Sequence, residues 1–308
     1  DSSGDKGGRL NKSGVAGTGS DIDMREVFFN VEGDFGTISA GRTLALFQRQ
    51  AILKDYTLFG VGAMGGPDSG GTTLGRIGYG YVYPDFRTRF TYKTPNINGF
   101  DLEVGIFDPQ EPIGSGAAGS VGSSETSSPQ FQAEANYKTD FEGGNAHLWA
   151  SFLWQEQDIT LSGGGSDSAE SFGYNIGLDL NMGGFNVMGS YYDGEALGTH
   201  LFNISGAGDA GCSATSCAES DNDGFIIQGA YTFNGTTKVG VSFGESTETT
   251  AANVKTRNSL WTVGVYHDVN SWLKVIAEYG QADANAGIQG GAGANEHDVF
   301  SIGGFLLW

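Results

Sequence analysis

Apolar and polar residues alternate with a period of two along most of the chain. Phe100, Leu102 and Val104, for example, alternate with Asp101 and Glu103. Such alternation is typical of β-strands with one apolar and one polar face. Thirteen strands are predicted in the sequence, and no convincing helix pattern lies between them. The strands are expected near residues 25–33, 36–46, 85–93, 100–106, 130–138, 148–154, 172–180, 185–191, 225–233, 238–243, 261–265, 273–279 and 298–308.

The connections between these strands alternate strictly in length. Short connections are expected at residues 33–36, 95–99, 139–145, 181–184, 233–237 and 268–271. Long connections are expected at residues 48–84, 109–128, 159–169, 194–222, 247–256 and 283–295. This pattern predicts an up-and-down barrel with tight turns at one rim and long loops at the other, as in membrane-spanning β-barrels. The predicted fold class is therefore all-β, a transmembrane antiparallel barrel that forms a single domain over residues 1–308.

The composition agrees with a barrel that faces lipid outside and water inside. The 308 residues include 52 glycines and 12% aromatic residues, but only 38% are hydrophobic. This balance is expected when only half of each strand needs to be apolar. No run approaches the roughly 20 apolar residues of a membrane-spanning helix. The net charge of −20 argues against nucleic acid as a partner, since phosphate contacts need basic surface.

The number of strands carries a further expectation. Single-chain bacterial barrels have an even number of strands, whereas 13 are visible, starting on the long-loop side and ending on the short-turn side. We expect an odd number of further strands, most simply three, before Asp1, which would give 16 in the complete chain. A strand count that is wrong by one is the alternative. Residues 1–22 read as loop, and no signal peptide begins at Asp1.

Basic residues gather in and around the longest connection. Residues 37–94 contain seven basic and three acidic residues, a local balance of +4 in a strongly acidic chain. Arg87 and Arg89 alternate with apolar residues, and an arginine facing hydrocarbon at mid-bilayer costs about 2–4 kcal/mol. Both are therefore expected to face water.

These charges suggest a constriction inside the barrel, at which charge sets ion preference. Arg87 and Arg89 would form its basic side, opposed by Asp55 and Asp68 from residues 48–84. In the alternative interpretation, the two arginines form ordinary salt bridges with Glu103 or Asp85. Further candidate constriction residues are Arg49, Lys54 and Arg76. Given the local positive balance, we expect weak anion preference or little ion selectivity.

Several motifs carry a resemblance to a known family. They are the segment from Arg25 to Arg42 (REVFFNVEGDFGTISAGR), the segment Arg-Phe-Thr-Tyr-Lys-Thr-Pro95 with the Gly99-Phe100 strand start, and the C-terminal Gly-Gly-Phe-Leu-Leu-Trp308. Together these resemble the trimeric, sixteen-stranded general porins of Gram-negative outer membranes. The specific motifs cover about a third of the chain, and the rest matches only by strand rhythm.

The resemblance implies a passive diffusion channel for small hydrophilic solutes and ions. It would be an integral outer-membrane homotrimer in contact with lipopolysaccharide and outer-membrane lipid. Residues 48–84 would be the constriction loop, and the strands at 25–33 and 36–46 would be the fourth and fifth of sixteen. Arg42 matches a family position that lines the constriction, although alternation alone points it outward. Trp308 would serve as the insertion signal, where family members typically end in Phe.

Other chemistry is sparse in the sequence. Cys212 and Cys217 are the only two cysteines, and either a local disulfide in an oxidising compartment or two free thiols is compatible with their spacing. Residues 219–223 resemble a fragment of a calcium loop without its carboxylate at the twelfth position. No cofactor or dedicated metal site is expected, while divalent cations at acidic extracellular loops stay an option.

Three alternative functions stay open from the sequence alone. A substrate-specific outer-membrane channel for a sugar or an anionic solute would share the predicted fold. An outer-membrane lipase or protease would need a set of catalytic residues, and no Ser-His-Asp, phosphate-loop or HExxH motif stands out. A soluble β-rich binding protein would not explain the alternation of turn lengths. A non-enzymatic diffusion channel is the preferred interpretation.

Overall fold

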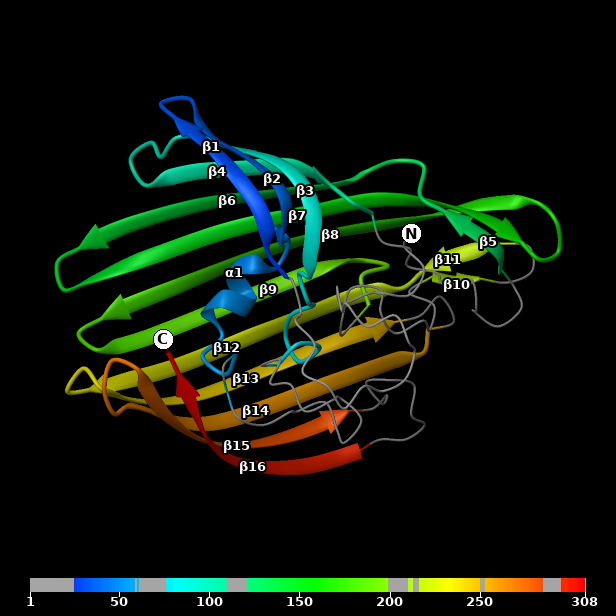
Figure 1. The fold of residues 1–308 in the computed structure, drawn as a ribbon. Coiled ribbons are helices and arrows are strands. Elements are labelled where there is room, and N and C mark those ends of the chain that lie inside the picture. Colours follow the sequence, from blue (N-terminus) through cyan, green and yellow to red (C-terminus); the bar gives the residue numbers. More distant parts are fainter. Residues whose placement is uncertain are drawn as a thin grey trace.

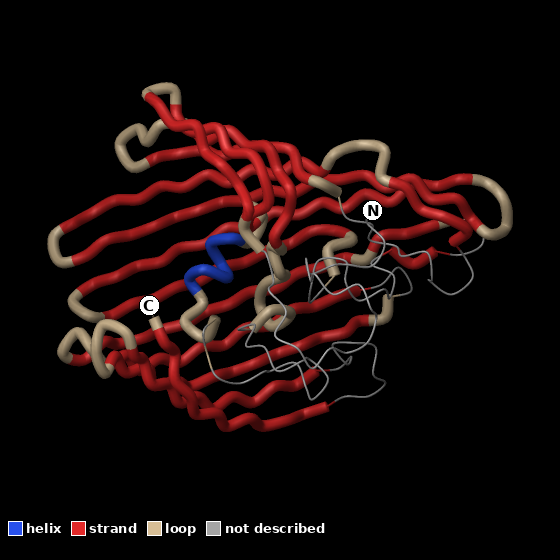
Figure 2. The backbone as a smooth tube through the Cα atoms, viewed as in Figure 1, coloured by secondary structure: helices blue, strands red, loops and turns tan. Residues whose placement is uncertain are grey.

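The computed structural model describes residues 25–58, 60, 76–109, 121–198, 210–212, 216–249, 253–284 and 295–307. In this part of the chain, 13 strands follow one another along a single antiparallel sheet (Figures 1 and 2). They are β1 (Val27–Gly33), β2 (Gly36–Leu44), β3 (Phe86–Lys93), β4 (Phe100–Phe107), β6 (Gln130–Phe141), β7 (Gly144–Leu161), β8 (Ser166–Met182), β9 (Phe185–Glu195), β12 (Asp221–Phe233), β13 (Thr237–Thr249), β14 (Lys255–Asp268), β15 (Leu273–Ala284) and β16 (Asn295–Leu306). Each corresponds to one predicted strand, so the predicted order of strands is confirmed.

Each of these strands pairs antiparallel with the next, which is an up-and-down topology. The sheet curves around its concave side, so that β1–β3 and β14–β16 lie on opposite sides of the short helix α1 (Arg49–Lys54) (Figure 1). Among the described residues no ladder joins β1 to β16, and the sheet is open there. No helix in these same residues is long and apolar enough to cross a membrane.

The two faces of the sheet have opposite chemistry. On β7, Leu148 and Phe152 lie on the outer face and are 45% and 36% exposed, whereas Ser151 and Gln155 on the inner face are 5% and 0% exposed. Exposed apolar and buried polar side chains invert the usual arrangement of a soluble protein. The outer face is therefore suited to hydrocarbon, and the inner face to water and to polar chain segments.

The predicted short turns are confirmed. The turn between β8 and β9 consists of Gly183 and Gly184, whose φ angles are 56° and 90°. Two positive φ angles match the twist of a tight two-residue hairpin, and glycine adopts them without steric cost. These turns lie together at one rim of the sheet (Figure 2).

One predicted long connection is wrong, because residues 159–169 are mostly strand. β7 continues to Leu161 and β8 begins at Ser166, which leaves only a four-residue turn. A membrane-crossing strand needs about 9–11 residues, so these strands of 18 and 17 residues extend well past that length. Beyond the lipid the outer positions need not be apolar, and the polar residues there conceal the strand in the sequence.

Two further predicted loops contain short strands. In the connection 109–128, β5 (Val121–Glu125) pairs with the far end of β7. In the connection 194–222, β10 (Ala210–Cys212) and β11 (Cys217–Glu219) form a separate two-stranded ladder. These strands have three to five residues, too few to show an alternation in the sequence.

The prediction that the chain has no helix is wrong at α1. This helix has six residues, and Gln48 before it adopts a left-handed conformation without a side-chain cap. So short a segment shows no helical period, and isolated helices of this length are unstable in water. Its stability comes instead from contacts with the inner face of the sheet.

Candidate functional site

The segment from Ala45 to Lys54 leaves the end of β2 and runs along the inner face of the sheet. Gln132 on β6 accepts hydrogen bonds from the backbone N–H groups of Leu46 and Phe47, both at 2.8 Å. Further along, Gln228 Nε2 on β12 donates to the carbonyl oxygen of Lys54 at 2.5 Å. The inner face of the sheet, called the wall below, thus supplies the hydrogen-bond partners that a buried backbone needs.

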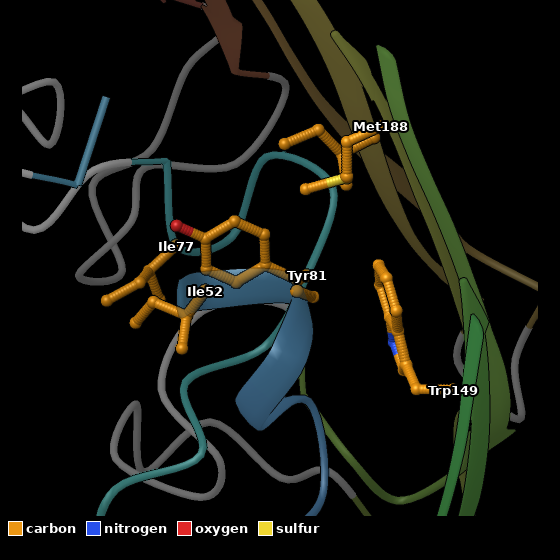
Figure 3. Close-up of a cluster of buried hydrophobic side chains, with 7 residues drawn as sticks. Ile52, Ile77, Tyr81, Trp149 and Met188 are labelled. Atoms are coloured by element: carbon orange, nitrogen blue, oxygen red, sulfur yellow. The ribbon is translucent and has the colours of Figure 1, made fainter. Parts of the chain in front are cut away.

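An apolar cluster holds α1 against this wall. Ile52 of the helix packs with Ile77 and Tyr81 from the returning part of the loop, against Trp149 on β7 and Met188 on β9 (Figure 3). The cluster is completed by Ala51 and Ile226. Fully burying one such side chain contributes about 1.5–3 kcal/mol. The loop is therefore packed onto the wall as a small core inside the sheet.

The other side of α1 is open. Leu53 is 53% exposed although its neighbours Ala51 and Ile52 are buried. An exposed leucine on a helix that lies inside the sheet faces the interior space. This is the surface past which a molecule moving through the sheet's concave side would travel.

Arg49 anchors the first turn of α1 to the wall. Its Nη2 atom lies 2.6 Å from Glu134 Oε1 on β6 and 2.8 Å from Glu103 Oε2 on β4. Burial alone would lower the pKa of Arg49, but the two carboxylates outweigh it and raise this pKa above its ordinary value. Arg89 Nη1 on β3 lies 3.4 Å from the same Glu103. Two arginines and two glutamates therefore form one group with no net charge.

Lys54 anchors the last turn of α1. Its Nζ atom lies 2.8 Å from Asp179 Oδ2 on β8. Asp179 also accepts a 2.6 Å hydrogen bond from Asn186 Nδ2 on β9. The helix is thus tied to the wall by an ion pair at each end, with the charges of both pairs balanced.

Asp55 does not oppose the arginines of β3, contrary to the predicted arrangement. Its Oδ1 accepts from Thr57 N–H and Oγ1 at 2.9 and 2.7 Å, and its Oδ2 accepts from Tyr81 Oη at 2.6 Å. A short side chain that caps its own turn is held there and cannot reach across the interior. Asp68, the second predicted acid, lies outside the described residues.

Arg76 is fully buried where the loop returns along the wall. Its guanidinium donates to Ser242 Oγ on β13 and to the carbonyl oxygen of Leu260 on β14. Burial lowers the pKa of Arg76, and the nearby Asp55 carboxylate opposes this effect. Arg76 therefore fastens the loop to the wall and does not face open space.

Arg87 and Arg89 share one face of β3. The register pairs Arg87 with Thr43 and Arg89 with Gly41 on β2. Arg87 Nη1 lies 3.5 Å from Asp85 Oδ2, and Arg89 also donates to the carbonyl oxygen of Leu44 at 3.1 Å. The salt bridges to Asp85 and Glu103 are those of the alternative interpretation of these arginines.

Arg42 is set apart from this group by the register of the sheet, although its charge acts on Arg87. The register pairs it with Val27 on β1 and Thr88 on β3, on the face opposite to Arg87 and Arg89. Alternation along the strand predicts this outward placement, whereas the resemblance implied an inward one. The register therefore does not support Arg42 as a constriction residue.

Three acids on the inner face of the sheet complete the site, and of these only Glu103 was named from the sequence, as an alternative partner of Arg87 and Arg89. They are Glu103, Glu134 and Asp179, which hold the basic side chains of the loop and of β3. Each occupies a polar position in an alternating strand, and this was the available signal. Their pairing with residues of a distant loop has no signature in a single sequence.

The remaining predicted sites lie elsewhere. Cys217 is disulfide-bonded and faces Cys212 in the β10–β11 ladder, and Cys217 N–H donates to Asp167 Oδ2 on β8 at 2.7 Å. Trp308 lies outside the described residues. Within the described part of the chain, no group of three or more His, Cys, Asp or Glu side chains is arranged to hold a metal ion.

Comparisons with known proteins agree with this architecture. A family model described as Gram-negative porin matches residues 4–287. The outer membrane channel DcaP of Acinetobacter baumannii is 12% identical, with a TM-score of 0.64 over 88% of this chain and 71% of that one. The anion-selective porin from Comamonas acidovorans is 15% identical, with a TM-score of 0.58 over 93% and 77%. The trimer form of OmpT from Vibrio cholerae is 17% identical, with a TM-score of 0.54 over 94% and 82%. The comparison with curated proteins finds no match.

Proposed function

The chain belongs to the Gram-negative porin family, and from this premise we propose which part of its barrel limits the passage of solutes. As a member of this family it is an integral outer-membrane protein, an antiparallel β-barrel channel through which small solutes diffuse. The proposed constriction is the interior space beside α1. The observation that carries this proposal is the attachment of α1 to the inner face through Arg49 and Lys54, with Leu53 left open.

The fixed position of α1 supports a passive size limit. The apolar cluster beneath the helix and the ion pairs at both its ends hold it on the inner face of the sheet. A constriction of this kind sorts solutes by size. The test is the swelling rate of proteoliposomes in sugars of increasing size, which is expected to fall steeply beyond a cutoff. A swelling rate independent of sugar size, or no swelling at all, would contradict the proposal.

We propose little ion selectivity at this constriction. The positive charges of Arg49, Arg89 and Lys54 are matched by three wall carboxylates within 2.6–3.4 Å. The basic excess of this segment in the sequence is therefore compensated locally, and more distant exposed charges are screened over about 8–10 Å in salt. The reversal potential in a KCl gradient is expected to lie close to zero. A strong preference for either ion would contradict the proposal that these charges neutralise one another.

Solutes are proposed to pass unchanged, without a catalytic step. The carboxylates of Glu134 and Asp55 accept hydrogen bonds that hold the loop in place. The check is recovery of the solute after transport into proteoliposomes. Chemical change of the solute that depends on the protein would overturn this part of the proposal.

A homotrimer is proposed as the assembly, with the outer face of β1 and β2 turned toward another copy. This face carries Arg42 beside Val27 and Thr88. An arginine exposed to hydrocarbon costs about 2–4 kcal/mol, and a protein neighbour removes that contact with lipid. Unheated electrophoresis should show a trimer, and the Arg42→Leu variant should shift the temperature at which the trimer dissociates. A monomer at every temperature would contradict the proposal.

A further inference from the structure

A polar cavity of about 520 Å³ lies on the short-turn side of α1. Its walls come from the end of α1, from the β6–β7 and β8–β9 turns, and from the beginning of β13. The polar side chains in this lining are Lys54, Asn145, Asp179, Asn181, Asn186, Thr232 and Lys238. The cavity therefore joins the tip of the constriction helix to the rim of tight turns.

The single carboxylate of this cavity is already occupied. Asp179 accepts from Lys54 Nζ at 2.8 Å, from Asn186 Nδ2 at 2.6 Å and from Asn181 Nδ2 at 3.3 Å. Lys54 and Asp179 thus cancel in charge. Neither contributes an unpaired charge to the cavity.

Lys238 is the remaining charged side chain in the lining of this cavity. Its Nζ atom lies 6.0 Å from the centre of the Tyr266 ring, a cation–π contact, and among the described residues it forms no ion pair. Lys238 pairs with Tyr266 across the sheet, and Asp268 lies two residues further along β14. Asp268 forms its own ion pair with Lys274 at 3.3 Å. With Lys54 and Asp179 cancelling, the cavity lining carries a net charge of +1 on Lys238.

Hydrogen-bond donors accompany this charge. Asn145 accepts from Asn181 Nδ2 through its Oδ1 at 3.1 Å, so its own Nδ2 stays available to a ligand. An ammonium and an amide donor beside a neutralised carboxylate are the groups that bind an oxyanion, because they supply charge-assisted and neutral hydrogen bonds together. A cation would meet the unpaired Lys238 and be repelled.

We propose that this cavity is a binding subsite for a small oxyanion, such as the carboxylate or phosphate group of a diffusing solute. The inference rests on the proposed diffusion channel, because the solute reaches the cavity past α1. The anion pairs with Lys238 and accepts a hydrogen bond from Asn145. While it is bound, it occupies space beside the constriction and reduces the chloride current. The ion pairs of α1 then give the constriction no net charge, while the cavity on the short-turn side of α1 binds anions.

The test is single-channel conductance in KCl with inorganic phosphate titrated on either side of the membrane. Wild-type protein should show a saturating fall in conductance. Lys238→Gln should weaken the apparent phosphate affinity by roughly fivefold or more, the factor expected from one ion pair at about 4 Å even in bulk water. Asp179→Asn frees Lys54 and raises the net charge of the cavity to +2, so it should strengthen the effect of phosphate.

The matched control is Lys255→Gln, which removes one exposed lysine at the start of β14, on the long-loop side. It should leave the phosphate affinity unchanged. A wild-type channel that conducts KCl but ignores phosphate would overturn the subsite alone, as would equal phosphate affinities in wild type and Lys238→Gln. Absence of any KCl conductance would overturn the channel as well. Unheated electrophoresis verifies that each variant assembles as wild type does.

Discussion

Replacing Arg49 by glutamine should make a non-selective constriction prefer cations. Arg49 and Arg89 together balance Glu103 and Glu134, so the variant changes this group from neutral to −1. A unit charge at about 4 Å from a passing ion is worth about 1 kcal/mol in bulk water, or roughly fivefold in occupancy, and more where water is restricted. The potassium-to-chloride permeability ratio is therefore expected to rise to about 5 or above.

The same substitution should also loosen the loop. The side chain of Glu134 is 0% exposed, and removing one partner of a buried ion pair typically costs about 3–5 kcal/mol. Current noise from loop movement should increase together with selectivity. The double variant Arg49→Gln, Glu134→Gln separates charge from anchoring by restoring neutrality. It should return the permeability ratio to near one while the ion pair stays absent.

The assay is the reversal potential across planar bilayers in a KCl gradient, measured for wild type and both variants. Unchanged selectivity in Arg49→Gln would refute the reasoning, because the neutral group would then not lie at the narrowest part of the path. Cation preference that persists in the double variant would refute the charge arithmetic, since its formal charge equals that of wild type.

Three further predictions concern the contacts that hold the loop on the wall and the disulfide-bonded β10–β11 hairpin. Trp149→Ala should destabilise the packing of α1 by about 3–5 kcal/mol and increase current noise, whereas the exposed Trp272→Ala should not. Arg76→Met removes the hydrogen bonds to β13 and β14. Trypsin should then cleave after Lys54, a site that the substitution leaves intact, faster than in wild type, and equal rates of cleavage after Lys54 would contradict this. The double variant Cys212→Ser, Cys217→Ser should keep the wild-type conductance, because its hairpin contacts the far end of β8 and not α1; a changed single-channel conductance would contradict this.

Much of the fold could be predicted from the sequence because strand alternation is a local signal. The segment from Phe100 to Ile106 shows both faces of β4 within seven residues, and such segments gave the 13 strands of the sheet in order. The long-loop ends of β7 and β8 were missed, since the outer face there carries polar residues such as Glu156 and Asp158 in place of apolar ones. The helix α1 was missed because six residues held by tertiary contacts have no period of their own.

The site was predicted only in part, for a related reason. Alternation correctly gave Arg89 the polar face of β3, where it meets Glu103. The contacts of the loop join residues far apart in the chain, since Arg49 meets Glu134 85 residues on and Lys54 meets Asp179 125 residues on. No single-sequence pattern encodes such pairs. The role given to Asp55 was wrong because local hydrogen bonds within its own turn satisfy it.

The central claim is that the open side of α1 borders the diffusion path, and Leu53 offers the most direct test of it. Leu53 is 53% exposed on the helix, and Cys217 is disulfide-bonded, so an added cysteine would be the reactive thiol. Single-channel conductance of Leu53→Cys should fall stepwise when a bulky methanethiosulfonate reagent is added. The same reagent on Ser162→Cys, in the exposed β7–β8 turn, should leave the conductance unchanged. A fully labelled Leu53→Cys channel with wild-type conductance would contradict the claim.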